Sequence, residues 1–206
     1  MVRITAGSWR GRRLEVPEGI RPTTELARKA AFDILGEAIV GASVLDACAG
    51  SGAYGLEAIS RGAEHATFVE SNRDVAKVLR GNVERLGAGE RASVEETTVA
   101  RFSSNGEKGR ERRGGPARAG GSLPARRSGA LARHSFDVIF HDPPFEEISE
   151  SDLHLLILLV RRGGWLFHER GDDRVFSPGG VEPVERRRYG TTRFLIFRPR
   201  GLRPPC

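Results

Sequence analysis

The chain has 206 residues, of which 38% are hydrophobic and 29% charged, and its formal net charge at pH 7 is +6. These values suit one globular domain with a full hydrophobic core. The longest apolar run, residues 153–160, is too short to span a bilayer, and no secretion signal is visible at the N-terminus. The two cysteines, Cys48 and Cys206, lie in a predicted loop and at the last position, so we expect no disulfide and a reducing cytoplasm.

Predicted helices and strands alternate along most of the chain. We expect an N-terminal arm at 1–22 and one α/β domain at 23–206, which begins with a helix at 24–37 capped by Thr24. Strands that alternate with helices predict a mostly parallel sheet covered on both faces, and the last two strands predict an antiparallel hairpin. The expected strands are 43–46, 65–70, 92–96, 136–141, 164–169, 181–188 and 192–198, and the other helices are 53–61, 73–86 and 149–161.

One segment interrupts this alternation. Residues 103–135 are rich in Gly, Arg, Ser, Pro and Ala and contain almost no large apolar residues. Such a segment buries too little surface to offset the entropy of ordering it. We therefore predict a disordered basic insertion between the third and fourth strands.

A glycine-rich loop follows the first strand of the predicted sheet. Gly50, Gly52 and Gly55 spell G-x-G-x-x-G, and Glu70 ends the next strand about 20 residues after the first glycine. This is the pattern of a dinucleotide-binding loop, in which the acid binds ribose hydroxyls. Asp46, however, ends the first strand where it would face a ligand amine better than a pyrophosphate. Because the chain is also too short for a second substrate domain, S-adenosylmethionine fits better than NAD.

A second motif ends the predicted strand 136–141. There an apolar run leads into Asp142, Pro143, Pro144 and Phe145. Consecutive prolines stiffen the turn and hold the carboxylate and the neighbouring carbonyls in set positions. Two acceptors beside an aromatic ring can grip a flat group that carries an NH₂. Taken alone, the motif fits a proline-stiffened loop equally well, but the glycine motif upstream favours a site.

With both motifs on one chain, the sequence resembles the RsmD-type family of bacterial 16S ribosomal RNA guanine-N2 methyltransferases. The resemblance covers nearly the whole length, and the N-terminal block and the Ser-Arg-Gly-Ala segment are the parts that point to this family. The matching segments are residues 2–14, 21–24, 31–35, 50–52, 55–63, 68–70, 142–145 and 189–190.

The resemblance implies a Rossmann-like class I S-adenosylmethionine-dependent fold, with a seven-stranded sheet, a C-terminal hairpin and a small N-terminal arm. It also implies catalysis by Asp142, Pro143 and Phe145, without a metal. At position 98 the family usually has an Asp that binds the adenine amine, and here Thr98 offers one hydroxyl acceptor instead. The expected cofactor-binding residues are Asp46, Gly50, Ser51, Gly52, Gly55, Glu70, Ser71 and Thr98.

Arginine accounts for 30 of the 33 basic residues, and it clusters in the arm, in the insertion and near the C-terminus. Arginine pairs with phosphate and stacks on bases, so the clusters suit RNA, although charge runs are often only solvated surface. We predict that the arm and the hairpin lie beside the Asp142 pocket of a monomer that binds 16S rRNA or the assembling small ribosomal subunit. The expected RNA-binding residues are Arg10, Arg12, Arg13, Arg21, Arg186, Arg187 and Arg188.

Three other functions are compatible with parts of the sequence. An adenine-N6 methyltransferase of DNA or RNA would use the same Asp-Pro-Pro-Phe chemistry. A small-molecule NAD enzyme would use the glycine motif but would leave Asp142 without a role. A non-catalytic RNA-binding or ribosome-assembly protein with a decayed cofactor site is favoured only by Thr98.

Overall fold

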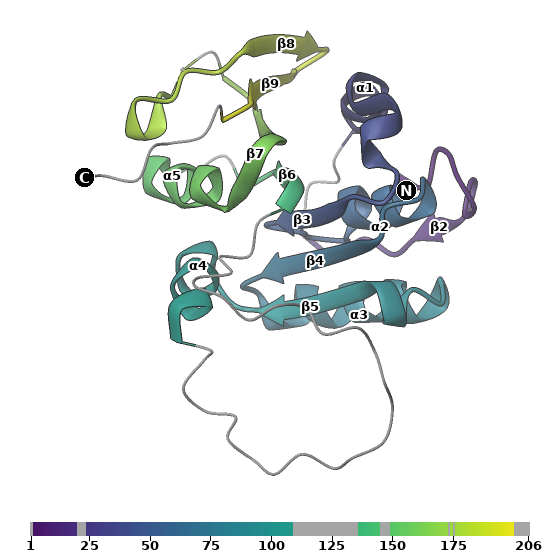
Figure 1. The fold of residues 1–206 in the computed structure, drawn as a ribbon. Coiled ribbons are helices and arrows are strands. Elements are labelled where there is room, and N and C mark those ends of the chain that lie inside the picture. The colour runs from purple at the N-terminus through teal and green to yellow at the C-terminus, as the bar shows by residue number, and fades with distance from the viewer. Residues whose placement is uncertain are drawn as a thin grey trace, which may run out of the picture.

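The computed structural model describes residues 2–19, 24–108, 136–144, 149–172, 174 and 176–199. Seven strands form one sheet in the order β5-β4-β3-β6-β7-β9-β8 (Figure 1). Strands β5 to β7 run parallel, whereas β9 is antiparallel to both of its neighbours. The mostly parallel sheet and the C-terminal hairpin are therefore as predicted. The strands are β3 (Ser43–Ala47), β4 (His65–Glu70), β5 (Ala92–Glu96), β6 (Phe136–His141), β7 (Val160–Arg170), β8 (Glu185–Tyr189) and β9 (Thr192–Phe197).

Helices cover both faces of the sheet (Figure 1). Alternate strand residues point to opposite faces, so Phe140 packs with α1, α2 and α3, while its neighbour Ile139 packs with α4 and α5. None of the described helices has the length and apolar character needed to cross a membrane. The helices are α1 (Glu25–Leu35), α2 (Ala53–Ser60), α3 (Arg73–Arg85), α4 (Val99–Lys108) and α5 (Glu150–Leu159), with short 3₁₀ turns η1 (Gly36–Ile39), η2 (Gly89–Arg91) and η4 (Pro178–Gly180).

Two helix predictions need correction. The first helix begins as expected, because the Thr24 side chain accepts a hydrogen bond from the Ala27 N–H. It ends at Leu35 rather than at 37, since Gly36 has a φ of 52° and starts a 3₁₀ turn. Helix α5 ends at Leu159 rather than at 161, because β7 already begins at Val160.

Helix α4 was not predicted. It starts at Val99 and continues to Lys108, so the expected insertion cannot begin at 103. Val99 is buried, and the Phe102 ring lies 6.4 Å from the ring of Phe136. These two anchors hold one face of the helix on the sheet. The remainder of the expected insertion, 109–135, lies outside the described residues.

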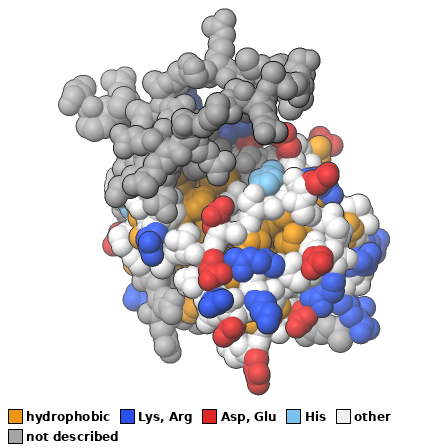
Figure 2. Space-filling model, turned by 90° about the horizontal axis from the view of Figure 1, so that it is seen from below, with side chains coloured by type: hydrophobic (Ala, Val, Ile, Leu, Met, Phe, Trp, Pro, Cys, Tyr) orange, Lys and Arg blue, Asp and Glu red, His pale blue; other side chains and the backbone are white. Residues whose placement is uncertain are grey.

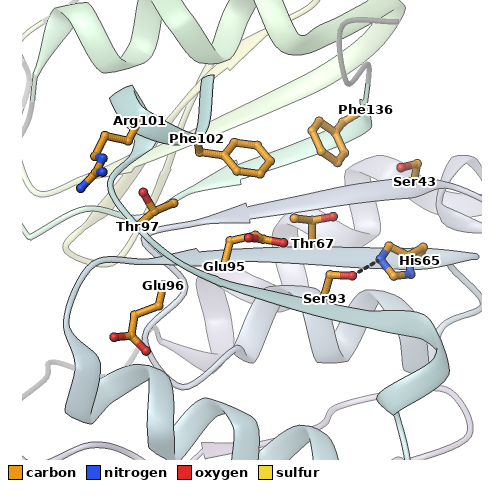
Figure 3. Close-up of a pocket in the computed structure, with 10 residues that line it drawn as sticks. All are labelled: Ser43, His65, Thr67, Ser93, Glu95, Glu96, Thr97, Arg101, Phe102 and Phe136. Carbon is orange, nitrogen blue, oxygen red and sulfur yellow. Dashed lines mark hydrogen bonds between the residues drawn. The ribbon is translucent and has the colours of Figure 1, made fainter. Parts of the chain in front are cut away.

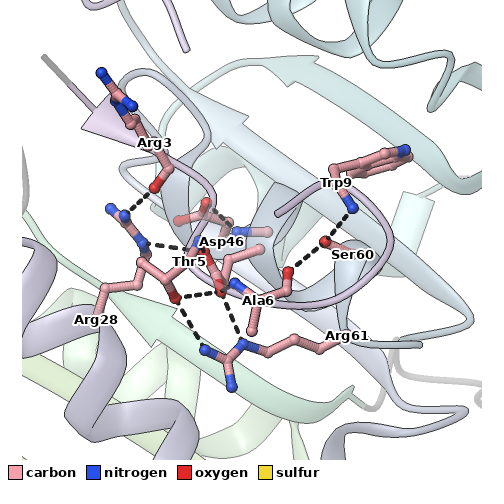
Figure 4. Close-up of polar contacts among 10 residues, drawn as sticks. Arg3, Thr5, Ala6, Trp9, Arg28, Asp46, Ser60 and Arg61 are labelled. Atoms are coloured by element: carbon pink, nitrogen blue, oxygen red, sulfur yellow. Dashed lines mark hydrogen bonds and ion pairs between the residues drawn. The ribbon is translucent and has the colours of Figure 1, made fainter. Parts of the chain in front are cut away.

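The N-terminal arm packs on the domain through a buried carboxylate. Glu57 of α2 is fully buried and accepts hydrogen bonds from the Thr5 N–H (2.7 Å), the Thr5 hydroxyl (2.6 Å) and the Ala6 N–H (3.0 Å). Arg61 and Arg28 lie 2.8 and 3.5 Å from the same carboxylate (Figure 4). The arm also forms its own two-stranded sheet, β1 (Val2–Arg3) with β2 (Arg13–Leu14).

Candidate active site

The predicted acids meet at one edge of the sheet. Strands β3, β4 and β6 are parallel and in register, so that Ala47 lies opposite Val69 on one side and His141 on the other. Their carboxyl ends therefore carry Asp46, Glu70 and Asp142 at the same edge, where ligands of such sheets bind. This convergence agrees with the expectation from the sequence.

The first two acids bind the glycine loop itself. Asp46 is buried, and its Oδ2 accepts a 2.8 Å hydrogen bond from the Gly55 N–H. Glu70 accepts bonds from the N–H groups of Gly50 (3.0 Å) and Asn72 (2.9 Å). The acids therefore fix the loop, and each carboxylate still has lone pairs for a ligand.

Two glycines of the motif are required for packing. A Cβ on Gly55 would lie 2.3 Å from the ring of Phe68, and a Cβ on Gly52 would lie 2.4 Å from Leu79. These glycines let α2 approach β4 and α3 closely. Gly50, with a φ of 55°, combines a left-handed backbone with a bond to Glu70. That the three glycines also contact a ligand stays a prediction.

The acidic edge is electrostatically strained. Burial raises the pKa of Asp46 well above its ordinary value; the hydrogen bond from Gly55 opposes this shift, and repulsion by Asp142 and Glu70 adds to it. Burial followed by repulsion from Glu70 likewise raises the pKa of the Cys48 thiol. The thiol is therefore protonated at neutral pH, which argues against a nucleophilic cysteine.

The Asp-Pro-Pro turn continues directly from β6. The Asp142 N–H lies 3.5 Å from the Ala47 carbonyl, which ties the turn to β3. Asp142 is half-buried, Pro143 buried and Pro144 exposed. Phe145, the predicted stacking residue, lies outside the described residues.

The other predicted cofactor residues lie around this edge with different local roles. The Ser51 carbonyl accepts a bond from Asn82 (2.9 Å), and Ser71 is exposed directly after Glu70. Thr98 is exposed at the carboxyl end of β5, and its hydroxyl accepts a bond from the Arg101 N–H at 3.3 Å. The Thr98 hydroxyl thus caps α4 and retains a second lone pair and its own proton for further partners.

Sequence reasoning missed a buried polar group beside the site. The Tyr54 hydroxyl donates to Glu169 (2.8 Å), and the Thr192 hydroxyl donates to the other oxygen of the same carboxylate (3.2 Å). Burial and then the Glu169 charge raise the pKa of Tyr54, and Asp142 contributes further. Glu169 could have been found, because it ends a predicted strand just as the other three acids do.

The predicted RNA-binding arginines do not all lie together. Arg12 donates to the Arg85 carbonyl (3.0 Å) in the last turn of α3, and the Trp9 N–H donates to Ser60 (2.9 Å) at the end of α2. Both helices start at the acidic edge and run back across the sheet, so the arm lies at the amino ends of the parallel strands (Figure 1). The prediction that the arm lies beside Asp142 is therefore wrong.

The hairpin, in contrast, turns at the acidic edge. Arg170 ends β7 and lies opposite Arg193, which in turn lies opposite Arg188. Arg186, Arg187 and Arg188 are exposed on β8, whereas Arg21 lies outside the described residues. On the face seen from below, the described basic and acidic side chains are interspersed (Figure 2).

A separate cavity of about 670 Å³ lies on the sheet beneath α4. It is lined by polar strand residues, including His65 and Ser93, which are hydrogen-bonded at 3.0 Å, and by Phe102 and Phe136 (Figure 3). None of the predicted site residues is among its described lining. Among the described residues, no group of three or more His, Cys, Asp or Glu side chains could hold a metal ion.

Comparison with known proteins agrees with this geometry. A family model described as "Conserved hypothetical protein 95" matches residues 2–112. The chain is 36% identical to "Ribosomal RNA small subunit methyltransferase D" of Escherichia coli (strain K12) over 170 residues, which are 82% of this chain and 71% of that protein. The chain belongs to this methyltransferase family. The resemblance predicted from the motifs is thereby confirmed.

Solved structures support the fold of this family member. A Thermus hypothetical protein, TTHA0928, is 30% identical and superposes with a TM-score of 0.74 over 96% of this chain and 99% of that chain. An RNA methyltransferase from Salinibacter ruber in complex with S-adenosyl-L-homocysteine is 11% identical, with a TM-score of 0.58 over 86% of this chain and 92% of that chain. The fold is the Rossmann-like fold of S-adenosylmethionine-dependent methyltransferases, as expected.

Proposed function

We propose that this methyltransferase transfers a methyl group from S-adenosylmethionine to the exocyclic N2 amine of a guanine in 16S ribosomal RNA. The observation that carries the proposal is the position of the Asp142-Pro143-Pro144 turn at the edge that also holds Asp46 and Glu70. The name of the Escherichia coli relative, which specifies the RNA of the small ribosomal subunit, supports the substrate class.

The charge of the site favours this cofactor over a dinucleotide. Asp46, Glu70 and Asp142 bring three carboxyl groups to one edge. Burial is the main cause of the raised pKa of Asp46, and repulsion by Asp142 and Glu70 adds to it. A ligand that carries an ammonium and a sulfonium group relieves this repulsion, whereas a pyrophosphate adds to it. Glu70 would bind the ribose hydroxyls, Gly50 to Gly52 would contact the methionine portion, and Thr98 would accept from the adenine amine.

The chain's own contribution to the reaction is to hold and orient the amine. When bound, the cofactor supplies a methyl group on a positively charged sulfur. The guanine amine is a poor nucleophile because its lone pair is delocalised into the ring. Hydrogen bonds from the NH₂ to Asp142 and the Pro143 carbonyl favour a pyramidal nitrogen with its lone pair directed at the methyl group. Most of the rate enhancement then comes from positioning the two reactants.

The target base must leave its stack to reach this turn, as is usual for enzymes that modify bases. Phe145 would stack on the base once it is turned out. We expect the enzyme to act in the cytoplasm, as a monomer, on 16S rRNA or on the assembling small subunit.

Two variants at the acidic edge test the proposal. Asp142→Ala should abolish methylation of 16S rRNA while S-adenosylmethionine still binds, because the partner of Asp142 is the substrate amine. Glu70→Ala should weaken cofactor binding by about 1–3 kcal/mol through the loss of charge-assisted hydrogen bonds. Calorimetry measures the binding, and a radiolabelled methyl group measures turnover.

The control is Asp33→Ala, which removes an exposed carboxylate of α1 and should change neither quantity. Mass spectrometry of the nucleosides distinguishes N2-methylguanosine from N6-methyladenosine. Near-wild-type turnover in Asp142→Ala, or N6-methyladenosine as the product, would contradict the proposal.

A further inference from the structure

A basic groove lies on the β8–β9 hairpin. Its volume is about 330 Å³, and the buried residues Phe194 and Leu195 form part of its wall. Five of the described residues that line it are arginines, against a single carboxylate. The charged lining residues are Asp172, Arg174, Arg186, Arg187, Arg188 and Arg193.

The groove lies at the same edge of the sheet as the Asp142 turn. His141 of β6 is opposite His168 of β7, and Arg170 at the end of β7 is opposite Arg193 of β9. Neighbouring strands are about 4.8 Å apart, so β9 is about 10 Å from β6. A nucleic-acid strand with one base at Asp142 would therefore have neighbouring phosphates within reach of the groove.

The single carboxylate of the groove is already paired. Asp172 forms an ion pair with Arg170 on one side, and the Arg174 Nε lies 2.6 Å from its other oxygen. Arg170 is fully buried, and its guanidinium stacks 4.5 Å from the centre of the Phe176 ring. A buried cation thus holds Asp172 in place, and the local charge around this carboxylate is positive.

Arg186 and Arg188 are the exposed cations best placed for a ligand. They are two residues apart on one strand and point to the same side, about 7 Å from each other. The Arg188 Nε donates to the Gly190 carbonyl (3.1 Å), which orients the guanidinium without neutralising it. Arg187, on the alternate side of the strand, is paired with Glu185 at 2.8 Å.

We propose that this groove binds the RNA backbone beside the target guanine, with Arg186 and Arg188 each contacting a different phosphate of one strand. The inference rests on the proposed function and assigns one surface to substrate binding. Arginine forks match phosphate geometry, and a row of them along a strand suits an extended polyanion better than a compact one. The groove then holds the strand while Asp142 holds the amine.

The test is the double charge reversal Arg186→Glu with Arg188→Glu. Each lost phosphate contact should lower the salt slope of RNA binding by roughly 0.7–0.9, so the pair should lower it by about 1.4–1.8. At low salt, the affinity for in vitro transcribed 16S rRNA should fall at least about tenfold. Cofactor affinity by calorimetry should not change. The neutral pair Arg186→Gln with Arg188→Gln should give a smaller change in the same direction, and it serves as the readout if the reversal impairs folding.

The matched control is Lys77→Glu with Arg162→Glu, which makes the same charge change at exposed positions outside the groove. Its salt slope should stay closer to that of the wild type. Equal slopes in the groove and control variants would overturn the proposal. If the slopes differ as expected but the wild type methylates no guanine, the proposed reaction fails while the groove assignment stands.

Discussion

The acid at position 46 combines a structural and an electrostatic role. A carboxyl whose pKa is raised on folding contributes stability that is fully present below its unfolded pKa and is lost as the pH rises through the folded pKa. Asp46 has such a raised pKa, chiefly through burial, relative to an ordinary value of 3.8. Its ionisation therefore destabilises the ligand-free protein at higher pH, and a cationic ligand should reverse that effect.

The variant Asp46→Asn tests this role. Its carbonyl oxygen can still accept from Gly55, but it carries no charge at any pH. We expect its melting temperature to exceed that of the wild type by a margin that grows as the pH is raised from about 5 to about 8, and its affinity for S-adenosylmethionine to fall. The control variant Asp33→Asn, at an exposed position of α1, should show no such trend. A margin that does not change with pH would show that Asp46 is not the titrating group.

At the residue scale, the sequence predicted the acids but not every role around them. Asp46, Glu70 and Asp142 were found because parallel strands end at a common edge. Gly52 and Gly55 were predicted only as ligand contacts, and the sequence did not show that Leu79 and Phe68 also require them to be small. The Tyr54–Glu169 hydrogen bond joins residues 115 positions apart in the chain. No local sequence pattern predicts such a long-range contact.

At the level of elements, helix α2 links the glycine loop to the N-terminal arm. All of its residues are buried, and Glu57 forms ion pairs with both Arg28 and Arg61. Removal of this carboxylate would leave the buried Arg28 without its carboxylate partner and two arm N–H groups without their acceptor. The arm, predicted as a separate segment, therefore depends on α2 for its position.

Glu57→Ala should lower the free energy of unfolding by about 3–5 kcal/mol, the usual cost of leaving a buried cation without its partner. Chemical denaturation at neutral pH measures this quantity. Glu37→Ala, at an exposed position of η1, should change it by less than about 0.5 kcal/mol. A loss at Glu57 no larger than this control would mean that the arm contacts contribute little to stability.

Element boundaries were predicted less well than the elements themselves. The predicted helix ended at 161 and the next predicted strand began at 164, yet β7 already starts at Val160 and passes through this whole stretch. A Cβ at Gly164 would lie 2.7 Å from the Asp137 carbonyl, so glycine here allows close approach of two strands. Helix α4 was missed because Val99 and Phe102 are its only large apolar anchors in a polar composition.

At the scale of the whole molecule, sequence order did not reveal which basic segments flank the site. The arm and the hairpin are both rich in arginine, but they lie at opposite edges of the parallel strands. Strand register places the hairpin turn beside Asp142, whereas contacts with the last turns of α2 and α3 place the arm far from it. The two arginine-rich surfaces lie at different distances from the reacting amine. Substitutions in them should therefore have separable effects on RNA binding and on turnover.

The arm can be tested by reversing Arg10 and Arg13, which are exposed, while keeping Arg12, whose bond to Arg85 fastens the arm to α3. If these arginines contact RNA, Arg10→Glu with Arg13→Glu should weaken binding at low salt and lower the salt slope by about 0.7–0.9 per contact. The effect should appear in KM, because the arm lies away from the reacting amine. The kcat at saturating RNA and the cofactor affinity should match the wild type. An unchanged salt slope would show that these arginines are only a solvated surface. RNA binding would then be assigned to the hairpin groove and not to the arm.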